Sequence, residues 1–376
     1  MKRRRIAQVV SSLALGGAER CALELAARLD RSRHDSTLLV AGETASGPLA
    51  EIAARQDLPI RTVQFRSLRH PADCARYIAT LRDFDIVHVH NRPLDYQTAA
   101  LLAAAPPLLK RPRFFWTCHL PYPDLTRSTR FRYRMTARTA RDTIACSPAV
   151  ARHLTGTIGI PATSVHTLTN GVDLDRYHPL PPSERNRIRQ SMNCEGKTVI
   201  ISAGRLTAQK GFDRFLSALA LLASHENLPP WEAWIAGGGP EHDRLRELIP
   251  GLRLESQVRL LGPRMDLHHL LAAADLFVLL SRFEGLPLAL LEALACGLPA
   301  VVSGIPAFSL LEADDAVSVS PDSADELEIA TGATKYIRSL VMDPAERERR
   351  ARKARQLAES RYDIRMWVKA HEQLYG

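Results

Sequence analysis

Short runs of aliphatic and β-branched residues alternate with longer segments of helical spacing along almost the whole chain. Between the first two runs the apolar residues Ala18, Cys21, Leu25 and Leu29 recur three or four positions apart, which predicts an amphipathic helix. In the first half the predicted strands are residues 6–10, 36–41, 61–65, 85–90, 113–118, 142–147 and 165–169. Repeated units of strand, helix and strand predict a parallel sheet that is covered by helices on both faces.

A proline-rich segment, residues 177–186 with the sequence YHPLPPSERN, interrupts this alternation. Proline lacks a backbone donor and disfavours a continuing helix, so we place an interdomain linker here. The alternation then resumes, with predicted strands at residues 198–204, 233–237, 258–262, 276–281, 300–303 and 316–320. A chain of 376 residues also exceeds the size at which one hydrophobic core keeps growing. We therefore predict two doubly wound α/β domains, residues 1–180 and 181–360.

Two helices are predicted after the last strand, at residues 344–361 and 363–375. The second has an apolar stripe that must pack on another part of the protein, formed by Ile364, Trp367, Val368, His371 and Leu374. The stripe alone does not identify the part of the protein on which this C-terminal helix packs.

The net charge of +9 belongs to the first half of the chain. Residues 1–188 hold 28 Lys and Arg against 16 Asp and Glu, whereas residues 189–376 hold 22 against 25. Four arginines of the first half lie close together: Arg127, Arg130, Arg132 and Arg134. They form either a solvated helix face or a site for an anionic partner, such as a phosphorylated acceptor or a membrane surface.

The start of the chain is basic, but the segment IAQVVSSLALGGAE that follows is too short and too polar for a signal peptide. No stretch approaches the roughly 20 uninterrupted apolar residues of a membrane-spanning helix. The six cysteines are scattered without paired or metal-ligand spacing, which indicates reduced thiols. These features predict a cytoplasmic protein and leave open a peripheral position at the inner face of the membrane.

Ligands of doubly wound sheets bind at the carboxyl ends of the strands, so the turns that leave those ends are informative. The turn LGGAE (15–19) opens a helix, where free N–H groups favour an anion, unless its glycines are required only sterically. In GRLTAQKG (204–211), Arg205 and Lys210 suit a diphosphate, unless they merely face solvent. The turn GGGPE (237–241) would let a nucleotide lie against its backbone, or is a plain loop.

None of these turns has the spacing of the dinucleotide-binding fingerprint. Arg20 and His242 stand where the third glycine would be required, and no acidic residue ends the strand after the first turn. An NAD-dependent dehydrogenase is therefore disfavoured.

Glu284 and Glu292 lie in an apolar stretch, SRFEGLPLALLEALACGLP, residues 281–299. Burying an unpaired charge is costly, so each glutamate must reach water, a partner or a ligand. Pro287 and Gly297 suit the start and the end of a helix over about 287–295, which puts Glu292 about 7 Å up the helix at ~1.5 Å per residue and leaves Glu284 outside it at its N-terminus. A phosphate at the helix N-terminus would lie between two carboxylates that accept hydrogen bonds from hydroxyls, which suits a nucleotide sugar.

Taken together, these residues resemble the retaining family-4 glycosyltransferases of GT-B architecture. The resemblance covers nearly the whole chain through Gly-Gly-Ala-Glu (16–19), DIVHVH (85–90), NGVD (170–173), GRLTAQKG, GGGPE and the Glu-x7-Glu pair. It implies two Rossmann-like domains that face a cleft, and a C-terminal helix, residues 361–376, that packs back on the N-terminal domain. It also implies transfer of a hexose-type sugar from a UDP- or GDP-sugar. The implied acceptor is a glycan, a small molecule, or a lipid-linked intermediate of cell-surface polysaccharide or glycolipid synthesis.

The resemblance also implies roles for individual residues. Arg205 and Lys210 are assigned to the diphosphate, Glu284 to donor-sugar hydroxyls and Glu292 to the ribose. His119 matches a histidine near the donor sugar, unless it is only a satisfied histidine that ends its strand. Donor-binding backbone is implied at Gly16, Gly17, Gly204, Gly238, Gly262, Gly285, Leu286 and Leu288. The resemblance implies no protein nucleophile, no metal-binding residues and no cofactor other than the nucleotide sugar as co-substrate. The implied activity is independent of metal ions or only weakly dependent on them.

Two groups of alternatives stay open at this point. A nucleotide-sugar epimerase and a sugar-phosphate synthase share the predicted fold. A protein of another class would use the basic first half to bind a membrane or a nucleic acid without catalysis. A nucleic-acid partner is not expected, because this half has no recognition helix and no basic strand interleaved with aromatic residues.

Overall fold

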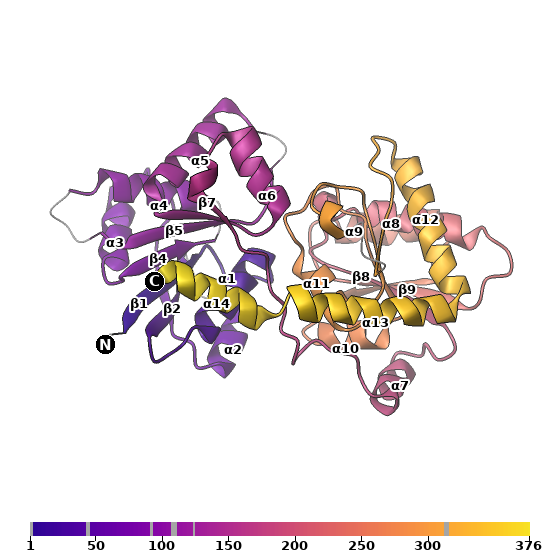
Figure 1. Ribbon diagram of the computed structural model, residues 1–376. Coiled ribbons are helices and arrows are strands. Elements are labelled where there is room, and N and C mark those ends of the chain that lie inside the picture. The colour runs from indigo at the N-terminus through magenta and orange to yellow at the C-terminus, as the bar shows by residue number, and fades with distance from the viewer. Residues whose placement is uncertain (1–2, 43–45, 91–92, 107–110, 123–124, 312–315) are drawn as a thin grey trace. The chain divides into compact units, whose positions relative to one another are not determined.

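The computed structural model describes residues 3–42, 46–90, 93–106, 111–122, 125–311 and 316–376 (Figure 1). The chain forms two compact units. Unit 1 comprises Met1–Asn170 together with Met366–Gly376, and unit 2 comprises Gly171–Arg365. Each unit is a parallel sheet covered by helices, and the two are described separately below.

Unit 1 contains a seven-stranded parallel sheet with the order β3-β2-β1-β4-β5-β6-β7. Its strands are β1 (Arg4–Val10), β2 (His34–Ala41), β3 (Ile60–Val63), β4 (Ile86–Val89), β5 (Arg113–Cys118), β6 (Asp142–Ala145) and β7 (Val165–Thr167). Its helices are α1 (Gly17–Arg28), α2 (Pro48–Arg55), α3 (Pro71–Leu81), α4 (Leu94–Ala104), α5 (Arg127–Thr139) and α6 (Pro148–Arg152), followed by the π-helical segment η1 (His153–Ile158) and the short 3-10 helix η2 (Ala162–Ser164). The last helix, α14 (Ile364–Tyr375), belongs to unit 1 from Met366 onward.

Unit 2 contains a six-stranded parallel sheet with the order β10-β9-β8-β11-β12-β13. Its strands are β8 (Thr198–Ala203), β9 (Trp231–Ala236), β10 (Val258–Gly262), β11 (Leu276–Leu279), β12 (Ala300–Val302) and β13 (Val317–Val319). Its helices are α7 (Pro182–Ser191), α8 (Phe212–Ala223), α9 (His242–Gly251), α10 (Leu267–Ala273), α11 (Leu288–Ala295), α12 (Glu326–Met342) and α13 (Pro344–Arg361), with the turns η3 (Ala208–Lys210) and η4 (Ser309–Leu311).

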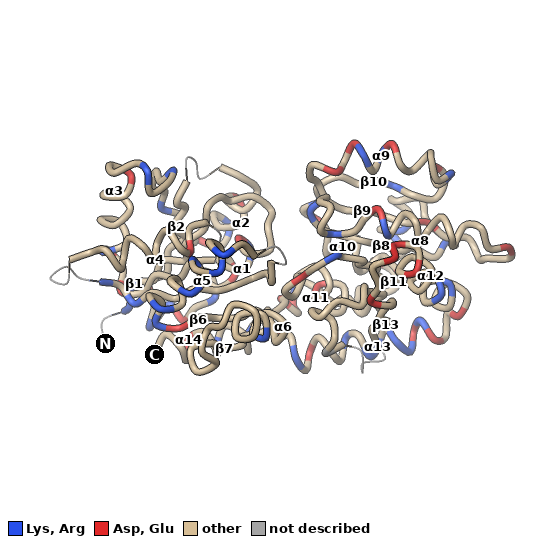
Figure 2. Tube along the Cα trace, turned by 90° about the horizontal axis from the view of Figure 1, so that it is seen from above, with Lys and Arg blue, Asp and Glu red and all other residues tan. Residues whose placement is uncertain are grey.

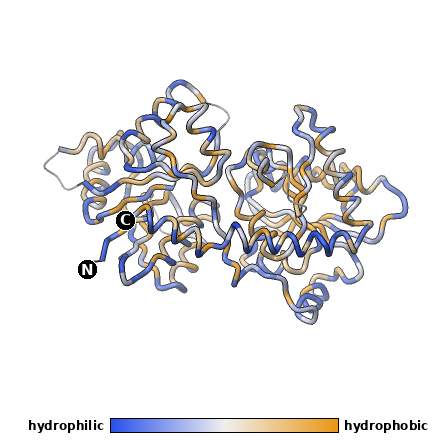
Figure 3. The backbone as a smooth tube through the Cα atoms, viewed as in Figure 1, coloured by the Kyte–Doolittle hydropathy of each residue, from blue (hydrophilic) through white to orange (hydrophobic). Residues whose placement is uncertain are grey.

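The predicted fold class is confirmed, and each predicted strand is present within a few residues of its expected bounds. The central strands could be predicted because they are buried on both faces and are therefore continuous apolar runs, whereas the edge strands β3 and β7 are more exposed. Figure 3 shows the contrast with α13, whose trace is mostly hydrophilic because long charged side chains cover its outer face. Only Ala354, Leu357 and Ala358 of α13 are buried.

The chain passes from unit 1 to unit 2 at Asn170–Gly171, before the proline-rich segment 177–186 where we placed the linker. The intervening residues Val172, Leu174 and Tyr177 are buried in the core of unit 2, and Val172 forms a backbone bridge with Asp363. The prolines therefore mark a turn on the surface of unit 2, while these apolar side chains bind the segment to that unit.

Candidate active site

The candidate site of unit 2 lies where the strand order of its sheet reverses. β8 and β11 are hydrogen-bonded neighbours, β9 and β10 extend the sheet on one side, and β12 and β13 extend it on the other. The loops that leave β8 and β11 therefore diverge from one carboxyl edge, which is the usual ligand position in such sheets. Residues 204–211 follow β8 and residues 280–287 follow β11, so both predicted motifs lie at this edge.

Hydrogen bonds join these two loops directly. The backbone N–H of Arg282 donates to Gln209 O over 2.7 Å, and Gln209 Nε2 donates to Phe283 O over 3.0 Å. Arg282 also donates to Ala208 O over 2.7 Å and forms an ion pair with Asp213 at 2.9 Å. Because these contacts use both backbone and side-chain groups, the loops form one rigid element.

Lys210 and Glu284 meet within this element. Lys210 Nζ lies 2.6 Å from Glu284 Oε1, and Ser281 Oγ donates to the same carboxylate oxygen over 2.8 Å. The glutamate side chain is 3% exposed and the lysine side chain 17% exposed. A carboxylate buried to this extent is stable only with a cation or several hydrogen-bond donors beside it. The ion pair with Lys210 therefore explains how Glu284 can be buried in the apolar stretch 281–299.

The other predicted residues of unit 2 lie in the same two loops, in α11 and in the glycine turns after β9 and β10. Arg205 is exposed in the loop after β8, and Gly285 and Leu286 are buried in the loop after β11. Helix α11 begins at Leu288, one residue later than predicted, with Pro287 as its N-cap. Glu292 is 2% exposed within α11, so it is a second buried carboxylate close to this edge.

The glycine turns of unit 2 are connected by their backbones. Gly237 N donates to Gly262 O over 2.8 Å, and Leu206 N donates to Gly238 O over 2.9 Å. A Cβ atom on Gly237 would lie 1.8 Å from the carbonyl oxygen of Gly204. Glycine is therefore required here by close backbone approach, which also holds the loops after β8, β9 and β10 together.

In unit 1 the predicted residues occupy several separate places. Gly16 is the N-cap of α1, and Gly17 is the exposed first residue of that helix. His119 follows β5 directly and is partly exposed. Burial, with a smaller contribution from His371, lowers the pKa of His119 to about 3, so its imidazole is neutral near pH 7.

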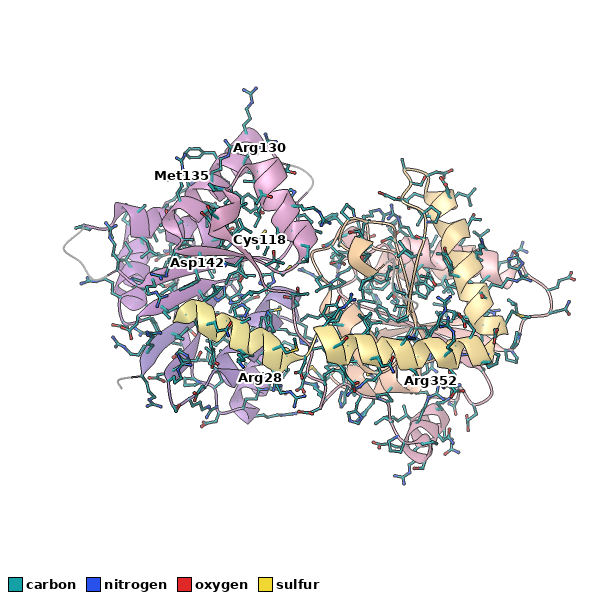
Figure 4. All side chains as sticks on the ribbon, in the orientation of Figure 1. Arg28, Cys118, Arg130, Met135, Asp142 and Arg352 are labelled. Carbon is teal, nitrogen blue, oxygen red and sulfur yellow. The ribbon has the colours of Figure 1, made fainter. Side chains whose placement is uncertain are left out.

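The four predicted arginines all lie on α5 and are exposed. Figure 2 shows the basic positions of this helix in blue. Arg132 lies over the ring of Tyr96, with 4.7 Å between the guanidinium carbon and the ring centroid, and Arg134 Nε donates to Ile158 O over 2.7 Å. Arg130 lies on the outer part of α5 (Figure 4). Phe131 beside them is 64% exposed, so this face of α5 combines cations with an exposed aromatic ring.

Gln8, His88 and His90 were not predicted as site residues. All three are buried in β1 or at the end of β4, and His90 Nδ1 lies 3.2 Å from His119 Nε2. Their signal in the sequence was the presence of polar residues inside the runs IAQVV and DIVHVH, which otherwise read as fully buried strands.

Within the described ranges, no helix is both long enough and apolar enough to cross a membrane. The same residues contain no group of three or more His, Cys, Asp or Glu side chains arranged to hold a metal ion. The six cysteines all lie within the described residues, and none of them forms a disulfide bond.

The sequence of this chain is similar to those of several curated glycosyltransferases. A GDP-mannose-dependent alpha-(1-6)-phosphatidylinositol dimannoside mannosyltransferase of Mycobacterium tuberculosis is 34% identical over 236 residues, which are 62% of this chain and 57% of that protein. A GDP-mannose:cellobiosyl-diphosphopolyprenol alpha-mannosyltransferase of Xanthomonas oryzae pv. oryzae is 29% identical over 331 residues, covering 81% of this chain and 79% of that one. The chain thus spans little more than half the length of the Mycobacterium protein, and it spans 37% of the length of another curated relative.

Among solved structures, Anabaena HepE in complex with UDP and glucose matches with a TM-score of 0.84 and 23% sequence identity, covering 99% of both chains, and so shows the fold. The family model for Glycosyltransferase Family 4 matches residues 15–176, and the model for Glycosyl transferases group 1 matches residues 184–357. The first range contains the strands of unit 1 from β2 to β7, and the second contains the whole sheet of unit 2 with the motifs at residues 204–211 and 281–299. The chain belongs to the family-4 glycosyltransferases of GT-B fold.

Proposed function

We propose that this protein is a retaining glycosyltransferase that transfers a sugar from a nucleoside diphosphate to an acceptor hydroxyl. The observation that carries the proposal is the Lys210–Glu284 pair at the β8–β11 edge, with Arg205 on the same loop as Lys210. A cation beside a carboxylate provides one group for a phosphate and one for a sugar hydroxyl. Under this proposal, Arg205 and Lys210 bind the diphosphate, Glu284 binds donor-sugar hydroxyls and Glu292 binds the ribose.

The proposed reaction has a simple balance of bonds. The bond between the anomeric carbon and the diphosphate oxygen breaks, and the diphosphate leaves with the electron pair. The acceptor oxygen forms a new bond to the same carbon from the same face, and its proton goes to the departing phosphate. Negative charge develops on the diphosphate, so fixed cations at Arg205 and Lys210 would stabilise the transition state more than the ground state.

For the donor, we propose GDP-mannose. The names of the Mycobacterium and Xanthomonas relatives both specify GDP-mannose, and the Xanthomonas match covers 81% of this chain. A UDP-sugar is the alternative, because the HepE structure contains UDP.

For the acceptor, we propose an anionic, lipid-linked molecule. The exposed arginines of α5 and the exposed ring of Phe131 suit phosphate groups beside an apolar chain or a membrane surface. The same two relatives are named for a phosphatidylinositol mannoside and a diphosphopolyprenol as acceptors. A peripheral position at the inner face of a membrane follows from this acceptor.

Product analysis tests the proposal. The protein is incubated with GDP-mannose, UDP-glucose and related donors, with and without lipid-linked acceptors, and the products are identified by mass spectrometry. We expect GDP release that depends on the acceptor, and an α-linked product by proton NMR. Product with the inverted anomeric configuration would refute retention. A rearranged nucleotide sugar formed without acceptor would identify an epimerase, and the absence of donor binding and turnover across the panel would refute the transferase.

A further inference from the structure

A chain of hydrogen bonds runs through unit 1, from His119 after β5 to Tyr375 in the C-terminal helix and from there back to Thr117 of β5. Its members come from β1, β4, β5 and α14, and Cys118 in Figure 4 marks the end of β5 next to its first member. The links are His119 Nε2 to His90 Nδ1 (3.2 Å), His90 Nε2 to Gln8 Oε1 (2.8 Å), Gln8 Nε2 to Tyr375 Oη (2.9 Å), Tyr375 Oη to His88 Nδ1 (2.6 Å) and His88 Nε2 to Thr117 Oγ1 (2.7 Å).

The amide of Gln8 gives the chain its direction. Its oxygen can only accept a hydrogen bond and its nitrogen can only donate one. Gln8 Oε1 faces His90 Nε2, so that ring nitrogen carries the proton. Burial holds the pKa of His90 well below its ordinary value, so its ring is neutral and Nδ1 has no proton. His119 Nε2 must therefore donate to His90 Nδ1.

The other half of the chain supports the same direction. Gln8 Nε2 donates to Tyr375 Oη, which directs the tyrosine proton to His88 Nδ1. His88 is neutral for the same reason as His90, so its Nε2–H donates to Thr117 Oγ1. Gln8 and Tyr375 are both 0% exposed, so water cannot replace either partner. Without the Tyr375 hydroxyl, the Gln8 nitrogen would lose its acceptor and the amide would be free to turn over.

We propose that Tyr375 and Gln8 are positioning residues for His119: through His90 they hold its imidazole as the Nε2–H tautomer, so that Nδ1 offers a lone pair to a hydroxyl of the donor sugar. This inference rests on the proposed function for the identity of the ligand, but the tautomer itself does not depend on it. A neutral ring that accepts a hydrogen bond recognises a hydroxyl, whereas an imidazolium would recognise a phosphate. Among the described residues, no hydrogen-bond partner is found for His119 Nδ1.

The test uses Tyr375→Phe, which keeps the ring and removes the hydroxyl. Tyr77→Phe is the matched control, because Tyr77 is another fully buried tyrosine of unit 1 and its hydroxyl bonds to Thr98 Oγ1 over 2.9 Å, outside the chain. The protein is labelled with 15N in its histidine rings, and the His119 signals are assigned by their loss in His119→Gln. We expect a protonated Nε2 and an unprotonated Nδ1 in the wild type and in Tyr77→Phe. In Tyr375→Phe the 15N chemical shifts of His119 Nδ1 and Nε2 should move toward each other, because the Nδ1–H tautomer becomes populated.

Kinetics provide a second measurement. Loss of one oriented hydrogen bond to the donor should lower kcat/KM by about 3- to 10-fold in Tyr375→Phe and leave it unchanged in Tyr77→Phe. With a series of deoxy donors, this difference should disappear for the one sugar that lacks the hydroxyl facing His119. A wild-type His119 with a protonated Nδ1, or unchanged His119 shifts in Tyr375→Phe, would overturn the proposal even if the enzyme is active. The expected tautomers in a protein that turns over no nucleotide sugar would refute the proposed function instead.

Discussion

Replacing Lys210 with methionine should destabilise unit 2 and strongly lower its activity. Methionine keeps much of the aliphatic stem but removes the cation that lies 2.6 Å from Glu284 Oε1. Of the partners that the described residues provide, the Ser281 hydroxyl at 2.8 Å would remain. A carboxylate with 3% exposure would then be buried without a countercharge.

The size of the effect follows from the burial of the pair. Breaking a fully buried ion pair by removing one partner costs about 3–5 kcal/mol. The Lys210 side chain is 17% exposed, so water reaches its position in part and we expect about 2–3 kcal/mol for Lys210→Met. For a unit of this size, that loss lowers the Tm by roughly 4–12 °C. Activity should fall by about two to three orders of magnitude, because the Lys210 ammonium would no longer stabilise the negative charge that develops on the proposed diphosphate leaving group.

A double variant separates the two effects. In Lys210→Met with Glu284→Gln, the buried charge is gone and the amide oxygen still accepts from Ser281, so stability should return to within about 1 kcal/mol of wild type. Activity should not return. Lys197→Met is the matched control, because Lys197 Nζ pairs with buried Glu232 over 2.8 Å, but Trp234 Nε1 and Arg259 also contact that carboxylate. We expect a smaller loss of stability and full activity.

Urea unfolding measures these changes, with hydrogen exchange of the β8 and β11 peptides to report on unit 2 alone. If Lys210→Met has the stability of the wild type, Glu284 is not held by this ion pair and the electrostatic reasoning is wrong. If the double variant regains activity, Lys210 does not act on the diphosphate.

Three further outcomes are expected. Glu284→Ala should weaken sugar selection and turnover, whereas Glu292→Ala should mainly weaken binding of the free nucleotide in calorimetry; wild-type behaviour of both would refute their assignment. Burial lowers the folded-state pKa of four histidines of unit 1, which are His88, His90, His119 and His371. Below about pH 6.5 these histidines take up a proton in the unfolded chain but not in the folded one, so the free energy of unfolding should fall. By pH 5.5 the loss should be about 1.4 kcal/mol for each histidine that stays neutral in the folded state. As the pH is lowered, the urea midpoint of unit 1 should therefore fall more steeply than that of unit 2. Among the described histidines of unit 2, His268 is the one whose pKa is also lowered. An equal fall of both midpoints would contradict the burial of these four histidines in neutral form. Replacing the four exposed arginines of α5 by serine should reduce flotation of the protein with anionic liposomes but not with neutral ones. Replacing the exposed Arg246 and Arg352 of unit 2 is the control and should leave flotation unchanged. Vesicle binding that is unaffected by salt or by the α5 change would refute the lipid role.

Much of the fold could be predicted because parallel strands that are buried on both faces appear as apolar runs of four to eight residues. The linker could not be placed from proline alone. Residues 171–177 belong to unit 2 because Val172 and Tyr177 pack into its core, and such packing depends on contacts with α11 and α13 that local sequence does not reveal. Similarly, the sequence indicated that Glu284 needs a partner, and it placed Lys210 at the same sheet edge, but only the joined loops show that the two are paired.

The buried chain in unit 1 shows where sequence reasoning could have gone further. In a sheet covered on both faces, a polar residue inside a strand must have a buried partner, so Gln8 and His88 were informative from the start. Once β1 and β4 are known to be neighbours, the register places Gln8 directly beside His88, and a polar cluster at this point follows. Its last member does not follow, because Tyr375 is 367 positions from Gln8 and lies on a helix whose stripe predicts packing but not its register. The orientation of His119 therefore depends on a residue that local sequence cannot connect to it, and this dependence is what Tyr375→Phe would reveal.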